Sequence, residues 1–353
     1  MQVNKMEVTP WDVKGDLNYD KLMKEFGIQK LPLLPPEFKD NLMFRRNIIY
    51  AHRDFGRILD AIKNKIPFVV MTGLVPTGKF HIGHMAIAKQ MIFYQKLGAK
   101  VYLCIADIEA YNARGQSLED SRKIAENEYI KGFKALGLKN ENCDLYFQSE
   151  RSKDAKKANA YYRLQNLLAK HATFNEFRAV YGEITPGKMV SALIQASDML
   201  HPMLPEFEGS VPVLVPVGVD QDPHLRLARD MAKRIKTHKF IQLSSTYNKF
   251  MPGLRGGKMS GSDPNSFIAL SDSPADVKKK VNKYAFSGGR ATVDEHRKLG
   301  GDPDVDVSYQ WLKFLEVDDA KLNKVHDDYK NGKLLSGELK KIIIEKIVTA
   351  FKK

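Results

Sequence analysis

The chain has 353 residues, and its 56 lysines and arginines exceed its 42 aspartates and glutamates to give a formal net charge of +14. This length predicts two domains or one large α/β unit with an appendage, while 43% hydrophobic and 28% charged residues exclude global disorder and two cysteines exclude a disulfide scaffold. The longest apolar stretches are far shorter than the roughly 20 residues that span a bilayer, and the N-terminus lacks the apolar core of a secretory signal, so we expect a soluble cytoplasmic protein without a membrane partner.

The order of the predicted elements indicates an α/β fold. A lead-in segment, residues 1–66, contains a proline-rich break and no chemical signature. After it, short apolar runs alternate with amphipathic stretches, which predicts a Rossmann-type, doubly wound parallel sheet with right-handed crossovers. The predicted strands are residues 68–72, 100–106, 144–147 and 213–219, and the predicted helices are residues 84–97, 117–137 and 186–201.

The domain organisation follows from a change in pattern near residue 270. We expect residues 67–270 to form the Rossmann domain, with a helical connecting insertion at about 151–205. Residues 271–353 contain two predicted helices, 275–286 and 336–351, and are expected to form a small helical domain. Positive charge is concentrated in residues 224–258, which carry nine basic residues and one acidic residue, and this favours nucleic acid as a partner.

The strongest local signal is the segment from Thr72 to His84, which runs from a strand through a Gly/Pro-rich turn into a helix. Such a turn offers backbone N–H groups and a helix dipole to an anion. Gly83 allows a nucleotide base to approach the backbone, and His81 and His84 can donate hydrogen bonds to phosphate oxygens. A zinc site is disfavoured because no third ligand lies nearby, so no metal ligands are predicted.

A second signal is the segment from Gly256 to Ser262. Lys258 supplies a point charge, Ser260 and Ser262 supply hydrogen-bond donors, and the glycines permit closure over a triphosphate.

Further polar residues lie at the predicted strand ends. Asp220 and Gln221 are placed to meet ribose hydroxyls or a small substrate, and Asp222 is equally well explained as a helix N-cap. Glu109 ends another strand and suits an ammonium group. On the helix 186–201, Gln195 shares a polar face with Ser191 and Asp198, and the sequence leaves open whether this face meets solvent or the crevice.

Together these residues resemble class I aminoacyl-tRNA synthetases, because His81-Ile-Gly-His84 matches the HIGH motif and Lys258-Met-Ser-Gly-Ser262 matches the KMSKS loop. The match is closest to tryptophanyl-tRNA synthetases of the archaeal and eukaryotic type. The segments that carry this resemblance are His52-Arg-Asp-Phe55, Ile194-Gln-Ala196, Asp220-Gln-Asp-Pro-His224, Ser245-Thr-Tyr247, Met251-Pro-Gly-Leu254 and residues 286–301.

The resemblance implies a Rossmann catalytic core, an anticodon-binding role for residues 271–353, a homodimer, ATP with Mg²⁺, L-tryptophan and tRNA(Trp). It implies catalytic roles for His81, His84 and Lys258. The residues it implies for ATP are Gly73, Thr77, His81, Gly83, His84, Asp220, Lys258, Met259, Ser260 and Ser262, and those for the amino acid are Glu109, Gln195, Gln221, Met71 and Cys104.

Two departures from the family pattern stand out. Gly261 replaces the second lysine of the loop, and Met71 and Cys104 stand where eukaryotic relatives place polar side chains toward the indole N–H. The expected function is tryptophan–tRNA ligation. The alternatives are tyrosine–tRNA ligation, a small-metabolite adenylyltransferase that uses the same His-x-Gly-His turn, and a synthetase-like RNA-binding module.

Overall fold

The computed structural model describes residues 7–8, 13–14, 18–257, 259, 261 and 263–351. The chain forms two compact units. Unit 1 comprises Met1–Pro36, Ile49–Thr77 and Ile87–Lys249, and unit 2 comprises Glu37–Ile48, Gly78–Ala86 and Phe250–Lys353.

Unit 1 is built on a sheet with the strand order β3-β4-β9-β8-β5-β6-β7. The five strands from β9 to β7 run parallel, whereas β4 is antiparallel to both β9 and β3. The sheet strands are β3 (Gln29–Lys30), β4 (Ile49–Arg53), β5 (Val69–Leu74), β6 (Lys100–Ile105), β7 (Cys143–Phe147), β8 (Val213–Gly218) and β9 (Ser244–Asn248), and a separate two-stranded pairing joins β1 (Glu7–Val8) to β2 (Val13–Lys14).

The four strands predicted from apolar runs are confirmed as β5 to β8. Their side chains are buried on both faces of the sheet, as in Val69, Val70, Leu103 and Leu214, and burying each such side chain contributes about 1.5–3 kcal/mol. The sequence analysis missed β9, whose side chains are buried although most are polar. It also missed β4, which comes from the segment taken as a lead-in.

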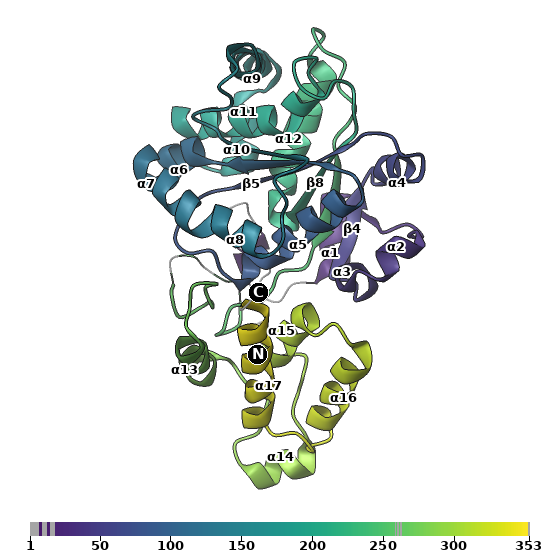
Figure 1. The fold of residues 1–353 in the computed structure, drawn as a ribbon, viewed down its shortest axis with the longest axis vertical. Coiled ribbons are helices and arrows are strands. Elements are labelled where there is room, and N and C mark those ends of the chain that lie inside the picture. The colour runs from purple at the N-terminus through teal and green to yellow at the C-terminus, as the bar shows by residue number, and fades with distance from the viewer. Residues whose placement is uncertain are drawn as a thin grey trace. The chain divides into compact units, whose positions relative to one another are not determined.

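Helices cover both faces of the parallel sheet, with α11 and α12 on one side and α5 and α8 on the other (Figure 1). This confirms the doubly wound α/β class. The helices are α1 (Tyr19–Phe26), α4 (Gly56–Lys63), α5 (Ile82–Lys96, its first turn assigned to unit 2), α6 (Asp107–Arg114), α7 (Leu118–Ile124), α8 (Lys131–Ala135), α9 (Ala155–Leu168), α10 (Phe174–Tyr181), α11 (Pro186–Leu200) and α12 (Asp222–Arg234).

The predicted helix 117–137 is continuous but not uniform, because a π-helical segment, Ala125–Ile130, lies between α7 and α8. The helix begins after the N-cap residue Ser117 and ends at Gly137, as the sequence predicts. The backbone N–H of Asp120 donates to Ser117 Oγ at 3.0 Å, and Gly137 has a φ of 103°, a conformation that glycine adopts without steric cost.

The direction in which successive strands are added to the sheet changes between β5 and β8. From β5 the chain moves through α5 to β6 and on to β7, whereas β8 leads through α12 to β9 on the opposite side. In open α/β sheets this reversal opens a crevice at the carboxyl ends of the two strands, where ligands bind.

Unit 2 is helical in its C-terminal part, in agreement with the predicted helical region. Leu339, Ile343 and Ile347 form the buried face of α17, as their spacing predicts. Arg46 pairs with Asp319 and so ties α3 to α16. The helices of this unit are α2 (Pro36–Lys39), α3 (Leu42–Arg45), α13 (Pro274–Tyr284), α14 (Val293–Leu299), α15 (Val307–Leu315), α16 (Asp319–Lys330) and α17 (Ser336–Phe351).

In the described ranges, none of these helices has the length and apolar character that crossing a membrane requires.

Candidate active site

A cavity of about 220 Å³ lies at the reversal between β5 and β8 in unit 1. This is smaller than the ≈300–1,000 Å³ that drug-sized ligands occupy, and it suits a single amino acid. Its walls combine a few polar groups with methionine and branched aliphatic side chains. The lining residues are Met71, Thr72, Gly73, Val75, Ala106, Glu109, Arg114, Gln148, Gln195, Asp198, Met199, Val215, Val217, Gln221, His224 and Leu225.

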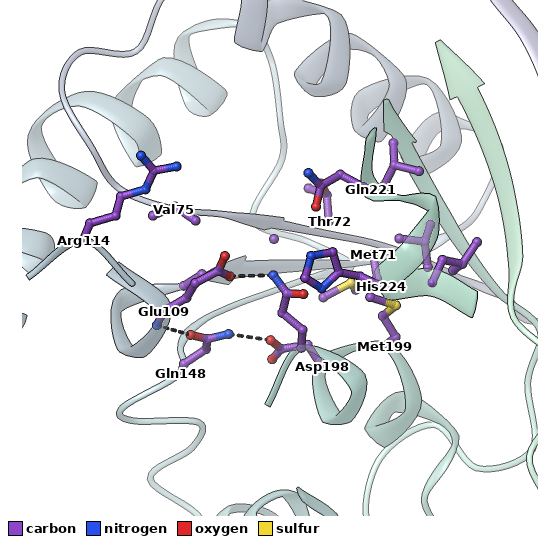
Figure 2. Close-up of a pocket in the computed structure, with 16 residues that line it drawn as sticks. Met71, Thr72, Val75, Glu109, Arg114, Gln148, Asp198, Met199, Gln221 and His224 are labelled. Atoms are coloured by element: carbon purple, nitrogen blue, oxygen red, sulfur yellow. Dashed lines mark hydrogen bonds between the residues drawn. The ribbon is translucent and has the colours of Figure 1, made fainter. Parts of the chain in front are cut away.

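A chain of hydrogen bonds crosses the floor of the cavity (Figure 2). Gln195 Nε2 donates to Glu109 Oε2 at 2.6 Å, and the backbone N–H of Glu109 donates to Gln148 Oε1 at 3.2 Å. Gln148 Nε2 in turn donates to Asp198 Oδ2 at 2.7 Å. The amide groups therefore hold two buried carboxyl groups in fixed orientations toward the cavity.

The carboxyl group of Asp198 accepts two further hydrogen bonds besides the one from Gln148. Its Oδ1 accepts hydrogen bonds from the hydroxyl groups of Tyr146 at 2.9 Å and Tyr161 at 2.7 Å. Burial raises the pKa of Asp198, while these donors oppose the shift. The open question about the polar face of α11 is thus answered: Ser191 and Asp198 are buried, and Gln195 and Asp198 line the cavity.

Glu109 has an unusual protonation equilibrium. Burial raises the pKa of its carboxyl group to about 7, and the hydrogen bond from Gln195 opposes this shift. The carbonyl oxygen Oε1 of Gln195 is buried and accepts no hydrogen bond within the described structure. A carboxylate and an unpaired amide oxygen side by side form a binding site for a ligand with a positive charge and N–H donors.

His224 lines the cavity as a neutral imidazole, because burial lowers its pKa to about 4. Its Nδ1 lies 3.4 Å from the hydroxyl group of Tyr181.

Most residues predicted to bind the amino acid meet in this cavity. Glu109, Gln195, Gln221 and Met71 line it, as does Gly73, which was predicted to contact ATP. Cys104 is fully buried and lies outside the lining, against Asp198 and Tyr146.

The remaining predicted residues of unit 1 are Asp220 and Thr77. Asp220 is buried beside Gln221, whose Nε2 donates to Asp220 Oδ2 at 3.2 Å. Thr77 accepts a hydrogen bond at its backbone oxygen from the hydroxyl group of Tyr129 at 2.9 Å. Neither residue lines the cavity.

The part of the predicted nucleotide turn from Gly78 onward lies in unit 2, and its two histidines stack with ring centroids 3.8 Å apart. The backbone N–H of His81 donates to His84 Nδ1 at 3.1 Å, and the backbone N–H of Gly83 donates to His81 Nδ1 at 3.2 Å. Both Nδ1 atoms are acceptors, so in the neutral rings the protons reside on Nε2. Burial lowers the pKa of His81 to about 4 and that of His84 as well.

The second predicted motif packs against this turn within unit 2. A Cβ at Gly83 would lie 3.0 Å from Met259 Sδ and 3.0 Å from the His81 ring, so any other residue here would require these side chains to shift by a few tenths of an ångström. At Gly78, which has a φ of 70°, a Cβ would lie 3.1 Å from the carbonyl oxygen of Gly261.

Backbone hydrogen bonds join the turn to the chain that follows the second motif. Ile82 N–H donates to Ile268 O, and Leu270 N–H donates to Phe80 O, each at 2.9 Å. Lys258, Ser260 and Ser262 lie outside the described residues. No group of three or more histidine, cysteine, aspartate or glutamate side chains that could hold a metal ion occurs in the described part of the chain.

Several lining residues were not among the predicted site residues. Gln148 directly follows a predicted strand, and His224 closes the Asp-Gln-Asp-Pro-His segment, so position at a strand end was a usable signal for both. Arg114, at the end of α6, carried no such signal.

Comparison with known proteins gives a consistent result. A model of the family described as tRNA synthetases class I (W and Y) matches residues 63–352. A tryptophan–tRNA ligase of Methanocaldococcus jannaschii is 42% identical over 357 residues, which cover 98% of this chain and 94% of that protein.

Solved structures agree in fold. The tryptophanyl-tRNA synthetase of Aeropyrum pernix is 41% identical with a TM-score of 0.89, covering 95% of this chain and 91% of that one. A tryptophanyl-tRNA synthetase of Encephalitozoon cuniculi bound to tryptophan is 30% identical with a TM-score of 0.82, covering 96% and 94%. The chain belongs to the class I tRNA synthetase family (W and Y).

Proposed function

We propose that this protein is a tryptophan–tRNA ligase, which activates L-tryptophan with ATP and transfers it to the 3′ end of tRNA(Trp). The observation that carries the proposal is the small cavity at the reversal of the sheet, with its buried carboxyl groups Glu109 and Asp198. The similarity to tryptophan–tRNA ligases over nearly the whole chain supports the same reaction.

The cavity has separate places for the two ends of the amino acid. Glu109 and the free carbonyl oxygen of Gln195 receive the ammonium group, and Gln221 adds a further polar contact to the same end. The side chain extends among Met71, Met199 and the aliphatic residues of β8, which provide apolar contact area for an aromatic ring.

Asp198 provides an acceptor for the indole N–H. Its carboxyl group accepts hydrogen bonds from Tyr146, Tyr161 and Gln148, and it remains part of the cavity lining. This contact would replace the polar side chains that eukaryotic relatives place at the positions of Met71 and Cys104.

Activation needs no covalent attachment to a side chain. A tryptophan carboxylate oxygen bonds to the α-phosphorus of ATP while the bond from that phosphorus to the bridging β-phosphate oxygen breaks, and pyrophosphate leaves with the electron pair. His81 and His84 donate from Nε2 to phosphate oxygens, and Lys258 stabilises the leaving pyrophosphate. Mg²⁺ would be supplied as part of the ATP substrate and would neutralise part of the charge of the phosphates.

The remaining roles are part of the same proposal. Residues 271–353 bind the anticodon region of the tRNA, Gly73, Thr77, Asp220 and Met259 contact ATP, and two copies of the chain form a homodimer. The cytoplasmic location also stays a prediction.

The decisive experiment is tRNA-independent ATP–pyrophosphate exchange with each of the twenty amino acids. We expect exchange with tryptophan at a kcat/KM at least about a hundredfold above that with tyrosine, because a site arranged for one polar ring atom leaves buried groups unpaired with another ring. Exchange that depends on tyrosine would replace the proposal by tyrosine–tRNA ligation, and exchange with no amino acid would contradict both.

A further inference from the structure

The one basic side chain among the described residues that line the amino-acid cavity is Arg114, since His224 is neutral. Arg114 is the last residue of α6, and its side chain is exposed at the edge of the cavity beside Val75 (Figure 2). Within the described part of the chain its guanidinium group makes no hydrogen bond or ion pair. A free cation therefore stands at the edge of a cavity whose interior is acidic.

The positive charge of Arg114 acts electrostatically on a group inside the cavity. It lowers the pKa of Glu109 against the larger effect of burial, and it also acts on Tyr129. By contrast, Arg122 on the next helix is engaged, with its guanidinium paired to Glu150 and stacked over Phe147.

The turn after α6 fixes this position. Gly115 ends the helix with a φ of 67°, and Gln116 Nε2 donates to the backbone oxygen of Pro76 at 2.8 Å. The end of α6 is thereby attached to the turn that follows β5, next to Val75 of the cavity wall. Arg114 is held at the edge by its neighbours in sequence, while its own five N–H donors stay available.

We infer that Arg114 binds the carboxylate of the amino acid and holds it for attack on ATP. The inference rests on the proposed function. A free amino acid carries an ammonium and a carboxylate group; the ammonium has its site at Glu109 and Gln195, and neither carboxyl group of the cavity can accept a second anion. The carboxylate must therefore face the edge of the cavity, where Arg114 lies, and the guanidinium fork fits it in two parallel hydrogen bonds.

The same contact assists the reaction. An anionic carboxylate must approach the negatively charged α-phosphate, and a guanidinium between them reduces the repulsion without transferring a proton. Arg114 thus contributes both to tryptophan binding and to the rate of adenylate formation.

The test compares two ligands that differ only in the carboxylate, tryptophan and tryptamine, by calorimetric binding to the full-length protein and to Arg114→Gln. We expect the substitution to weaken tryptophan binding about tenfold or more and to leave tryptamine binding within about twofold. The kcat for pyrophosphate exchange should also fall, and Arg114→Lys should restore part of both losses, because lysine keeps the charge without the fork.

Arg163→Gln is the matched control, since this exposed arginine pairs with Glu206 and lies outside the lining. It should change neither ligand's affinity. Unchanged tryptophan binding in Arg114→Gln, or equal weakening of both ligands, would overturn the inference. Absence of tryptophan-dependent exchange in the unsubstituted protein would instead refute the proposed function.

Discussion

At the scale of single residues, binding the ammonium group of the amino acid requires a buried carboxyl group, Glu109, to be ionised, and burial makes that ionisation unfavourable. Glu109 must be ionised to attract an ammonium group, yet burial raises the pKa of its carboxyl group to about 7. The free protein therefore holds this group close to half-protonated at neutral pH, and a bound ammonium favours the ionised form.

We predict a pH dependence of tryptophan capture from this group. Below pH 7 Glu109 takes up a proton and loses its attraction for the ammonium, so kcat/KM for tryptophan should fall about tenfold per pH unit. The measurement is pyrophosphate exchange between pH 5.5 and 8.5. In Glu109→Gln the value should be low throughout and lack this inflection; an unchanged inflection would assign it to another group.

The same carboxyl group should destabilise the folded protein above pH 7. Its folded pKa lies above the ordinary value of 4.5, so between these values the native state binds more protons than the unfolded state and stability falls as pH rises. We expect Glu109→Gln to be more stable than the unsubstituted protein at pH 8, by about 3 kcal/mol, and nearly equal to it at pH 5. Urea unfolding at the two pH values measures this, and an equal difference at both would contradict it.

The sequence predicts a side chain's role in helix capping correctly where its hydrogen-bond partners are close in the chain. Ser117 is the N-cap that its spacing to Asp120 predicts. For Asp222 an N-cap was one of two equally good explanations, and this one is wrong, because Gln221 occupies that position and the Asp222 side chain is fully buried against Arg53 and Tyr247. A partner 169 residues away leaves no trace in local spacing.

At the scale of elements, this buried pair attaches α12 to the sheet. Arg53 Nε and Nη2 donate to the two oxygens of Asp222 at 2.8 and 2.9 Å, which joins the end of β4 to the first turn of α12. The same turn carries Gln221 and His224 into the cavity. The missed strand β4 therefore positions part of the site from the far side of β9.

We predict that Arg53→Met destabilises the protein by about 2 kcal/mol or more and raises KM for tryptophan, because the buried Asp222 would lose its bidentate partner and keep only the half-exposed Arg226 as an ionic partner. Urea unfolding and exchange kinetics measure the two effects. The double variant Arg53→Met with Asp222→Leu should recover part of the stability.

Arg57→Met serves as the control on the neighbouring helix. Its partner Asp54 also pairs with Arg229 and is partly exposed, so we expect a change within about 0.5 kcal/mol. A comparable loss in both variants would show that Arg53 acts through its bulk and not through the ion pair.

Among the elements, continuous apolar runs identified the parallel strands β5 to β8, because strands buried on both faces need such runs. The same rule fails for β9, in which Ser244, Ser245 and Thr246 are buried. Its place between β4 and β8 depends on pairing with distant strands and not on its own composition.

At the scale of the whole molecule, the net charge of +14 matches a polyanionic substrate. We predict that tRNA-dependent aminoacylation is far more sensitive to salt than adenylate formation. Raising KCl from 50 to 200 mM should weaken tRNA binding about a hundredfold if four phosphates are contacted.

Exchange without tRNA, measured at the same two salt concentrations, is the internal control and should change less than about threefold. The expectation fails if both activities respond equally to salt, since the loss would then lie in the amino-acid or nucleotide site.

The neutral, stacked histidine pair has a consequence for an acidifying cell. Burial lowers the pKa of His81 to about 4 and holds the pKa of His84 well below its ordinary value, so neither ring gains a proton in a mild acidification. A fall in pH to about 6 would therefore lower kcat/KM for tryptophan through protonation of Glu109, while both imidazoles would stay neutral. Charging of tRNA would become limited by amino-acid supply at a point where the nucleotide chemistry is still intact.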